Sequence, residues 1–483
     1  MRRFPLVVTA IPAALALGVP LSVAVPAAHA IGTGGGVATG TFDGFAKDVV
    51  TTGLGDPYEI LWGPDDFIWA TEKSGKKVTR IAPKTGAKIT ALDLTEKAIH
   101  TEDGQDGVLG LAFHPDLLKN KGHDYVYVSY TYDSNTSPYE VDQRLRIDRY
   151  TYDRKTQKLG QPKNLIAGLA SGTDHQSARL RYGPDGKLYY TIGDQGANQL
   201  QHACEPNRAQ ALPTEAHIKA KDWITYRGKT LRLDPEDGSI PKDNPVLDGV
   251  RSHVWAYGFR NAQGLAFGPD GTLYNTDQGP KTDDEVNILT KGTNYGWPYV
   301  AGYRDDKAYA YHDWAASSPT PCADLTYSDL KVPGSVPQQK ETDWKGKFTE
   351  PVRTFNTVDN GYNFADPKCA KGNLYFICWP TVANSSLTYY PASGGIAGWR
   401  DSLLMTTLKD GSVYQMQLTD KGRKIGKVTR MWTSRNRYRS IALSPDGKSV
   451  YVATDSAGLV RDKNGAGTTR LENPGSVLVF RQK

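Results

Sequence analysis

The chain is poor in cysteine and methionine, with four of each among 483 residues, and it has no long apolar run after its first 25 residues. The absence of a second run excludes a mature protein that crosses a membrane with helices. Runs of basic residues are also absent, and the net charge is only +6, of which Arg2 and Arg3 supply two. We therefore expect no nucleic acid among its partners.

Glycine and proline are abundant instead, with 49 and 29 residues, and charged residues make up only 23%. This composition is typical of many short strands joined by turns. A chain of this length can bury a large core, either as a propeller or as two to three average domains. We predict an all-β fold with helix confined to short pieces.

The N-terminus has the three parts of an export signal. Arg2-Arg3 precede an apolar stretch from Phe4 to Val25, and Ala28-His29-Ala30 follow as a cleavage site with small residues. An anchoring helix is the alternative, which the prolines in the stretch and the lack of a following basic cluster disfavour. We predict a signal peptide over residues 1–30, a flexible glycine-rich segment over residues 31–44, and a secreted, extracellular protein.

The four cysteines of an exported chain can form disulfides. Cys369 and Cys378 bracket a short Lys-Gly-Asn turn that closes easily, so we predict a bond between them. Cys204 and Cys322 either form a second bridge or stay free, and the sequence does not decide between the two.

One local pattern recurs six times: a turn rich in proline, aspartate and glycine, followed by a short aromatic or β-branched strand. Proline presets the first turn position, and aspartate and glycine suit the next ones. The repeat predicts a six-bladed β-propeller over residues 45–483, with long insertions above all between residues 280 and 399. Two packed β-sandwiches are the alternative, but they do not explain why the same strand type follows each turn. The copies are Gly63-Pro64-Asp65-Asp66, His114-Pro115-Asp116, Gly183-Pro184-Asp185-Gly186, Gly268-Pro269-Asp270-Gly271, Trp399-Arg400-Asp401-Ser402 and Ser444-Pro445-Asp446-Gly447.

Polar residues are dense just before or after these strands. In a propeller the equivalent strand ends of all blades converge around one channel, so we expect a site assembled from every blade. A histidine with carboxylates and four cations suits a small polyanion beside a general base, although each residue alone is more typical of a structural role. The residues are Gln105, Asp174, His175, Gln176, Asp194, Gln195, Arg260, Asn261, Asp277, Gln278, Lys409, Arg437, Tyr438 and Arg439.

Seven longer phrases lie around these residues. They are Asp174-His175-Gln176-Ser177, the heptapeptide at 190–196, Gly258-Phe259-Arg260-Asn261, Asp277-Gln278-Gly279-Pro280, Asn294-Tyr295-Gly296-Trp297-Pro298, Ile377-Cys378-Trp379-Pro380-Thr381 and Asn436-Arg437-Tyr438-Arg439. Through them the chain resembles the soluble quinoprotein glucose dehydrogenases from about residue 45 to residue 480. That family is a six-bladed propeller that holds pyrroloquinoline quinone (PQQ) over a calcium ion.

The resemblance implies an enzyme that oxidises aldoses such as glucose at C1 to the lactone and passes electrons to a small or protein acceptor. His175 would take the proton of the C1 hydroxyl, Asp194 would orient its imidazole, and Arg260 would donate to the quinone oxygen. Gln105, Asp174 and Trp379 would bind the sugar. The cofactor would be held by Arg260, Asn261, Gln278, Thr381, Lys409, Arg437 and Arg439. Because the family is dimeric, a homodimer is a further implication.

The resemblance also implies two calcium sites, in keeping with the preference of calcium for oxygen ligands. The catalytic ion would be bound by the backbone carbonyls of Gly279 and Pro280 and would act as a Lewis acid. A structural ion would be bound by Glu285, Tyr295, Ala301, Asp305 and Glu341.

Three departures from the family pattern lie near the expected sugar pocket and leave the preferred sugar open. Phe376 stands where a tyrosine is usual, Asp410 follows Lys409 where a basic residue is usual, and residues 201–210 diverge. Two other functions are alternatives. A calcium-dependent propeller lactonase would use a carboxylate cage and no polyanion site, and a non-catalytic propeller would use the polar ring only to bind a ligand.

Overall fold

A computed structural model describes residues 37–39, 44–135, 137 and 139–483, all of which belong to one unit of residues 32–483. The expected signal peptide over residues 1–30 lies outside the described residues, as does most of the expected flexible segment over residues 31–44. Within that segment, β1 (Val37–Thr39) pairs in parallel with β26 (Lys424–Met431).

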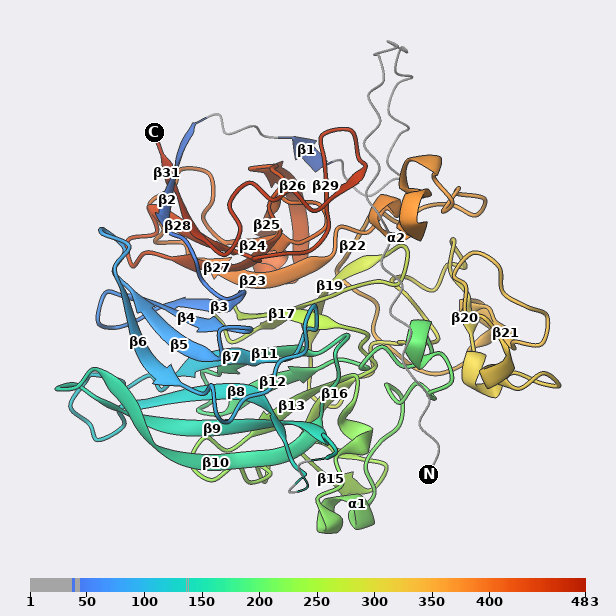
Figure 1. Ribbon diagram of the computed structural model, residues 1–483, viewed down its shortest axis with the longest axis horizontal. Helices are drawn as coiled ribbons and strands as arrows, with labels where there is room; N and C mark the ends of the chain where they lie inside the picture. Colours follow the sequence, from blue (N-terminus) through green and yellow to red (C-terminus); the bar gives the residue numbers. More distant parts are fainter. Residues whose placement is uncertain (1–36, 40–43, 136, 138) are drawn as a thin grey trace, which may run out of the picture. The chain divides into compact units, whose positions relative to one another are not determined.

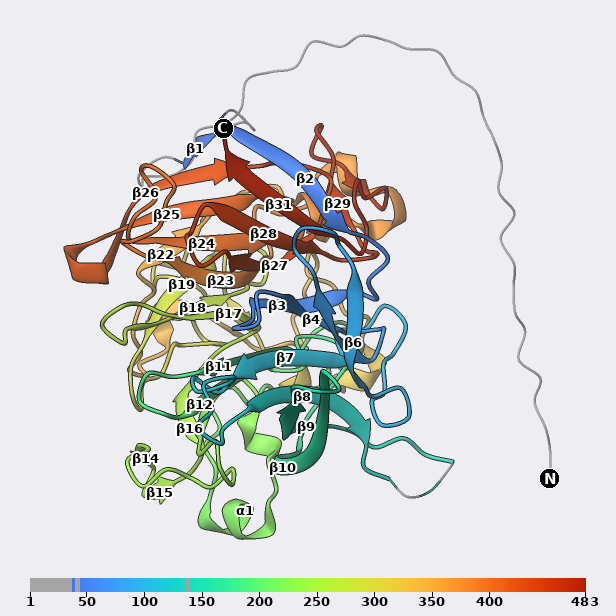
Figure 2. The same ribbon diagram turned by 90° about the vertical axis from the view of Figure 1, so that its left-hand side faces the viewer.

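Six sheets form the blades of the predicted propeller, and each contains four antiparallel strands. Figure 2 shows them set around a common centre, with β3, β7, β11, β17, β23 and β27 innermost. The first three blades consist of β3 (Pro57–Trp62), β4 (Ile68–Glu72), β5 (Lys77–Ile81), β6 (Lys88–Asp93); β7 (Val108–Phe113), β8 (Tyr125–Asp133), β9 (Gln143–Asp153), β10 (Lys158–Ala170); and β11 (Ser177–Tyr182), β12 (Leu188–Ile192), β13 (Lys229–Leu233), β16 (Val254–Tyr257). The last three consist of β17 (Ala262–Phe267), β18 (Leu273–Asp277), β19 (Asp284–Leu289), β22 (Arg353–Phe355); β23 (Asn384–Tyr390), β24 (Ser402–Thr407), β25 (Val413–Thr419), β26; and β27 (Tyr438–Leu443), β28 (Ser449–Thr454), β31 (Val477–Gln482), β2 (Phe45–Thr51).

The ring closes by joining the two ends of the described chain. Strand β2 is the outermost strand of the last blade, where it pairs with β31. Each innermost strand contacts the innermost strand of the next blade, and β27 contacts β3 in the same way. Hydrophobic clusters fill the spaces between neighbouring blades, so that packing between blades holds the ring together.

The repeated turns connect the innermost strand of each blade to its second strand, as the sequence predicts. In several copies the turn aspartate also binds the aromatic residue of the strand that follows. Asp65 Oδ1 accepts from Trp69 Nε1 at 3.0 Å, and Asp185 Oδ2 accepts from the Tyr189 hydroxyl at 2.8 Å. In these two copies the bond links the turn to the strand that follows.

All six innermost strands begin with an irregular register, close to the residues that line the cavity described below. A bulge inserts extra backbone and re-aims the side chains beside it. The shifts occur between Pro57 and Glu59, Val108 and Leu111, Ser177 and Leu180, Ala262 and Gly264, Asn384 and Leu387, and Tyr438 and Ser440.

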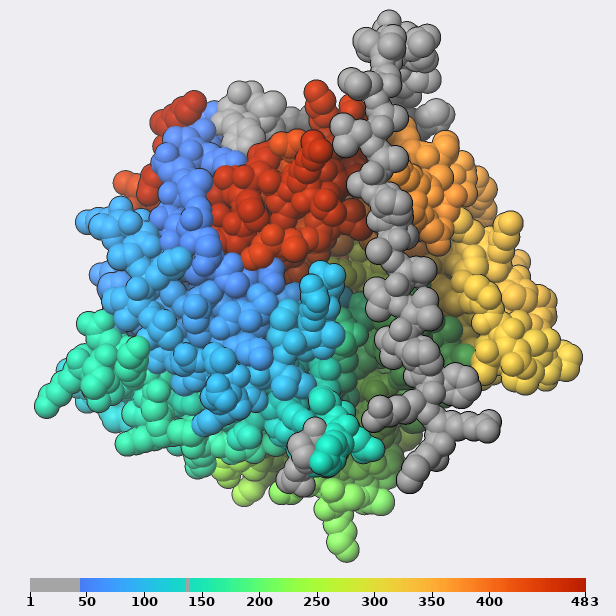
Figure 3. Space-filling view, in the orientation of Figure 1, coloured from blue at the N-terminus to red at the C-terminus, as the bar shows by residue number. Residues whose placement is uncertain are grey.

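The insertions lie on one side of the blades, with β20 and β21 in yellow and α2 in orange in Figures 1 and 3. Helices are short, as predicted, and among the described residues none has the length and apolar content needed to cross a bilayer. The remaining elements are α1 (Glu215–Ala220), α2 (Tyr375–Cys378), the ribbons β14 (Val246–Leu247) with β15 (Val250–Arg251), β20 (Tyr311–His312) with β21 (Gln338–Gln339) and β29 (Val460–Arg461) with β30 (Gly467–Thr468), and the 3-10 turns Leu200–His202, Ile224–Tyr226, Trp314–Ala316, Cys322–Asp324, Glu341–Asp343, Pro367–Cys369, Lys371–Asn373 and Asp420–Gly422.

Candidate functional site

A cavity of about 490 Å³ lies where the innermost strands begin. Residues just ahead of those strands line it, among them Gln105, His175, Arg260 and Arg437. The described cavity lining includes no residue of the first blade, β3 to β6, so the expectation of a site assembled from every blade is wrong for that blade, whereas the other five blades contribute.

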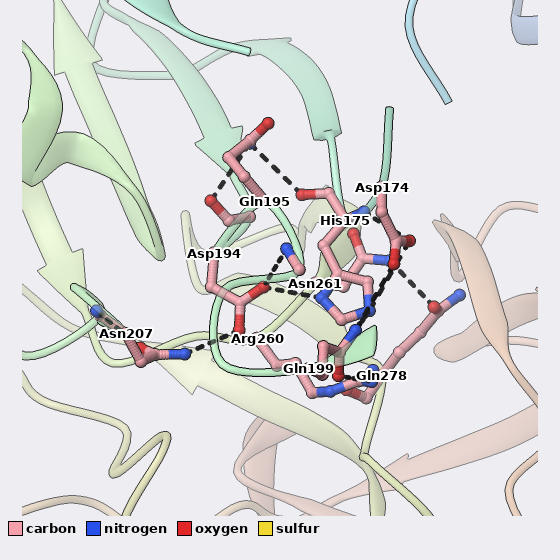
Figure 4. A network of polar contacts seen from close by, with 12 residues as sticks. Asp174, His175, Asp194, Gln195, Gln199, Asn207, Arg260, Asn261 and Gln278 are labelled. Atoms are coloured by element: carbon pink, nitrogen blue, oxygen red, sulfur yellow. Dashed lines mark hydrogen bonds and ion pairs between the residues drawn. The ribbon is translucent and has the colours of Figure 1, made fainter. Parts of the chain in front are cut away.

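His175 and Asp194 form a buried pair at the wall of this cavity (Figure 4). His175 Nδ1 lies 2.6 Å from Asp194 Oδ1, and the other oxygen of Asp194 accepts from Asn207 Nδ2 at 3.0 Å and Trp297 Nε1 at 2.8 Å. A carboxylate can only accept, so Nδ1 carries a proton, and in the neutral form of the imidazole Nε2 is the nitrogen with the lone pair. Asn207 and Trp297, which the sequence did not single out as functional, fix the carboxylate.

Gln199 joins the catalytic candidates to one another. Its Nε2 lies 3.1 Å from His175 Nε2, and its Oε1 accepts from Arg260 Nη2 at 2.9 Å. No repeated motif marks this position, and only its neighbourhood to the divergent residues 201–210 could have drawn attention to it. Gln199 therefore lies at the imidazole nitrogen that a substrate hydroxyl would approach.

Asp174 stays in its carboxylate form beside this group. Burial alone would raise the pKa of Asp174, but the nearby charges of His175 and Arg260 lower it below its usual value. Gln105 Nε2 donates to Asp174 Oδ1 at 2.7 Å, and both residues line the cavity. Together they offer a hydrogen-bond acceptor and an amide to the hydroxyl groups of a polar ligand.

Lys409 also lines the cavity and is only 6% exposed. Its Nζ donates to Phe376 O at 2.9 Å, to Trp379 O at 3.2 Å and to Thr381 Oγ1 at 2.5 Å, all of them uncharged oxygens. Burial and the neighbouring Arg461 lower the pKa of Lys409 well below its usual value. A bound carboxylate would relieve both effects.

Three of the residues predicted to bind the cofactor are hydrogen-bonded to other protein side chains, and two of the three lie outside the cavity lining. Arg437 lines the cavity and also pairs with Asp455, at 2.9 Å between Nε and Oδ2. Arg439 and Asn261 do not belong to the cavity lining. Arg439 donates to both oxygens of Asp455 at 2.7 and 2.8 Å, and Asn261 Nδ2 donates to Gln278 Oε1 at 2.9 Å. They support the cavity residues from behind.

The expected calcium ligands fall in two places. Gly279 and Pro280 line the cavity, and Arg260 Nη1 lies 3.3 Å from Gly279 O. Of the second set, Glu341 accepts from the backbone of Ala301 at 2.9 Å and of Asp305 at 3.3 Å, and Glu285 accepts from Gly302 N at 2.7 Å. The Tyr295 hydroxyl is directed elsewhere, to Ile288 O at 2.6 Å.

Burial raises the pKa of Glu341 to about 8, and burial together with the charge of Asp277 raises that of Glu285 well above its usual value. Buried carboxylates of this kind are stabilised by a cation. Elsewhere in the described part of the chain, His114, Asp116 and His123 bring three ligand atoms within 4.8 Å. There Lys121 pairs with Asp116 at 3.0 Å and the Asp116 N–H occupies His114 Nδ1, so these groups are already engaged.

Both disulfides are formed. The predicted bond between Cys369 and Cys378 is confirmed, and Cys204 also bonds to Cys322. The second bond joins the segment after Gln199 to the insertion with Trp314 and Tyr327, which line the cavity. Phe376, where the sequence loses a hydroxyl, also lines the cavity and is 43% exposed.

Comparisons with known proteins agree with this geometry. The model of the Glucose / Sorbosone dehydrogenase family matches residues 54–342 and 358–461. Quinoprotein glucose dehydrogenase B of Acinetobacter calcoaceticus is 46% identical over 447 residues, which cover 91% of this chain and 92% of that protein. The structure of the PQQ-bound aldose sugar dehydrogenase of Streptomyces coelicolor aligns with a TM-score of 0.59 at 22% identity, over 90% of this chain and 98% of that one. The apo-form of the soluble aldose sugar dehydrogenase of Escherichia coli aligns with a TM-score of 0.61 at 22% identity, over 91% and 100%.

The fold and the site thus define a propeller dehydrogenase. The chain belongs to the Glucose / Sorbosone dehydrogenase family.

Proposed function

We propose that this chain is a secreted quinoprotein dehydrogenase that oxidises aldose sugars such as glucose at C1 to the lactone. The observation that carries the proposal is the 2.6 Å contact of His175 Nδ1 with the buried Asp194 Oδ1, because His175 lines a cavity that Arg260, Lys409 and Arg437 also line. A general base and a set of cations in one cavity suit the oxidation of a neutral sugar beside a polyanionic cofactor. The 46% identity to a quinoprotein glucose dehydrogenase supports the same reaction.

His175 takes the proton in this proposal. A sugar bound with its C1 hydroxyl at His175 Nε2 displaces the amide of Gln199, which lies 3.1 Å from that nitrogen. Nε2 accepts the hydroxyl proton, and Asp194 stabilises the imidazolium that forms. Gln105, Asp174 and Trp379 orient the sugar through the cavity lining to which all three contribute.

Three cationic residues of the cavity lining, Arg260, Lys409 and Arg437, suit a small ligand with several carboxylates. Lys409 Nζ has only uncharged oxygens as hydrogen-bond partners, and Arg260 Nε is a buried donor without a partner among the described residues. Lys409, Arg437, Gln278 and Thr381 would hold the cofactor, while Asn261 and Arg439 support them from behind. PQQ, when bound, supplies the acceptor for the hydride of the sugar.

Calcium is the metal that we assign to the two oxygen-rich places. The carbonyls of Gly279 and Pro280 would hold the first ion at the cavity, and calcium, when bound there, supplies a Lewis acid. A second ion at Glu285, Tyr295, Ala301, Asp305 and Glu341 would balance carboxylates whose pKa values burial raises. A calcium-dependent lactonase is disfavoured because Lys409 and Arg437 line the same cavity.

The test is a panel of sugars with a dye acceptor on protein loaded with PQQ and calcium. The expected product of glucose is the C1 lactone, whereas 1,5-anhydroglucitol, which has no hydroxyl at C1, should not react. Hydrolysis of lactones by protein that contains calcium but no PQQ, without oxidation of glucose by the loaded protein, would support the lactonase instead. In this proposal the enzyme passes electrons to a small-molecule or protein acceptor and forms a homodimer.

A further inference from the structure

Two cationic side chains meet at one backbone carbonyl behind the cavity wall. Lys409 Nζ lies 3.2 Å from the carbonyl oxygen of Trp379, and Arg461 Nη2 donates to the same oxygen. Lys409 follows β24, whereas Arg461 lies in the separate ribbon of β29 and β30. Arg461 lies outside the motifs that the sequence marks as functional.

Arg461 donates hydrogen bonds to several backbone carbonyls of the segment from Ile377 to Thr381, called the wall below. Its Nε donates to Ile377 O and its Nη2 to Thr381 O, both at 2.8 Å, in addition to the bond to Trp379 O. Its backbone N–H donates to Lys409 O at 2.9 Å. A planar guanidinium with five donors can hold three carbonyls of one segment at once, which the single ammonium of a lysine cannot do in the same geometry.

A carboxylate near Arg461 is already engaged with another arginine. Arg430 Nε and Nη2 donate to the two oxygens of Asp410, each at 2.9 Å, whereas Arg461 Nη1 lies 3.5 Å from Asp410 Oδ1. The shorter ion pairs of Asp410 are therefore those with Arg430. The short contacts of Arg461 are to the wall carbonyls.

The donors of Lys409 are fully used in this arrangement. A lysine ammonium has three N–H groups, and those of Lys409 donate to Phe376 O, Trp379 O and Thr381 Oγ1. To bind a cofactor carboxylate, Lys409 must release at least one of these oxygens. An oxygen released in a buried site costs stability unless another donor stays with it.

We propose that Arg461 is a positioning residue that holds the segment from Ile377 to Thr381 when Lys409 turns to the cofactor. The inference rests on the proposed function, because it assigns a carboxylate-bearing cofactor to Lys409. Arg461 keeps Trp379 and Thr381 in place for sugar and cofactor, while His175 and Asp194 lie in another blade. Loss of Arg461 therefore weakens binding and leaves the proton transfer at His175 intact.

The test compares Arg461→Gln and Arg461→Lys with the matched control Arg430→Gln, which removes the closer partner of Asp410 without touching the wall. PQQ binding is titrated on cofactor-free protein with calcium present, and KM for glucose and kcat are then measured at saturating PQQ. Arg461→Gln should weaken PQQ binding about tenfold, as the loss of bonds to buried carbonyls implies, and should raise KM while kcat changes little. Arg461→Lys should recover part of the affinity, and Arg430→Gln should bind PQQ like the wild type.

Two results would overturn the inference: wild-type PQQ affinity in Arg461→Gln, or an equal loss in Arg430→Gln, which would assign the effect to Asp410. If Arg461→Gln gives no cooperative thermal transition, Arg461→Lys decides, since wild-type affinity and KM in that variant contradict a need for the forked guanidinium. A wild-type protein that binds no PQQ would reject the proposed function itself, a result that the variants cannot mimic.

Discussion

The carboxylate of Asp194 is fully buried, and its Oδ1 lies 2.6 Å from Nδ1 of His175. Because Nδ1 is committed to this bond, Nε2 is the imidazole nitrogen that remains to accept a proton. The pair therefore sets both the orientation and the tautomer of the proposed base.

Replacement of His175 by alanine should separate chemistry from binding. In the proposed complex Lys409 and Arg437, not His175, would hold the quinone, so its affinity should stay near that of the wild type. Turnover at saturation should fall by roughly two to four orders of magnitude, the usual worth of a positioned general base. PQQ titration followed by steady-state kinetics gives both values. Lost affinity with wild-type turnover at saturation would show that His175 is not the base.

Asp194→Asn tests the tautomer directly. An asparagine amide can donate to Nδ1, which then places the proton on Nε2 and leaves no lone pair for the sugar hydroxyl. Turnover should fall by roughly the same factor as in His175→Ala, with the fold and PQQ affinity retained. Asn207→Ala is the milder comparison, because Trp297 still donates to Asp194. Near-wild-type turnover in Asp194→Asn would contradict the orienting role.

The affinity for PQQ should depend on pH through Lys409. Burial and Arg461 lower the pKa of Lys409 in the free protein, and a bound carboxylate favours its charged form, so binding is coupled to proton uptake. Affinity should therefore fall as the pH rises through the lowered pKa, below the usual lysine value of about 10.4. Titrations of wild type and Lys409→Met across this range test the coupling. The variant should bind weakly without this pH dependence, and a wild-type affinity that is constant over the range would argue against the contact.

Much of the fold could be predicted because its cause is local. The turn residue Asp185 and the strand residue Tyr189 are hydrogen-bonded to each other and lie close together in the sequence. The repeat is therefore visible in the sequence itself. The polar residues ahead of the innermost strands could also be placed, since equivalent strand ends converge. In contrast, Gln199, Trp297 and Arg461 lie in insertions without a repeat, and only the folded chain brings them to the site.

The sequence also could not predict which of two nearby arginines lines the cavity and which is buried behind it. Arg437 and Arg439 were expected to bind the cofactor in the same way, yet Arg439 faces Asp455 and stays behind the cavity. The two arginines are separated by one residue at the start of an irregular strand, where side-chain direction depends on the bulge between Tyr438 and Ser440.

Asp455 should stabilise the protein except in acid. Burial alone would raise its pKa, but Arg439 and Arg437 lower it to about 2. Its contribution is present above its ordinary pKa of about 3.9 and should be lost as the pH falls towards about 2. Asp455→Asn, which leaves the buried guanidinium of Arg439 and the partly buried one of Arg437 without a carboxylate, should cost about 3–5 kcal/mol in unfolding free energy at pH 7. The exposed pair of Asp48 and Arg481 provides the control, because Asp48→Asn should change little. Equal unfolding free energies of the two variants would contradict the assignment.

The two disulfides should differ in their effects. Cys204 and Cys322 are 118 residues apart, whereas Cys369 and Cys378 are nine apart. On the loop-entropy model the longer loop contributes about 4–5 kcal/mol and the shorter about 2–3 kcal/mol. Denaturant unfolding of the two double serine variants measures the difference. The variant without the Cys204–Cys322 bond should also have a raised KM for glucose, since that bond anchors the insertion with Trp314 and Tyr327; a KM equal to that of the wild type would exclude this effect.

The most direct test of the proposed function is reconstitution of cofactor-free, chelator-treated protein with PQQ and calcium, each alone and both together. Oxidation of glucose is followed with a dye acceptor, and His175→Ala serves as the control that binds PQQ without efficient turnover. We predict that only the sample with both additions oxidises glucose, and that His175→Ala treated in the same way is slower by roughly two to four orders of magnitude. Full activity in the sample without PQQ, or no activity of the wild type with both additions present, would contradict the proposal.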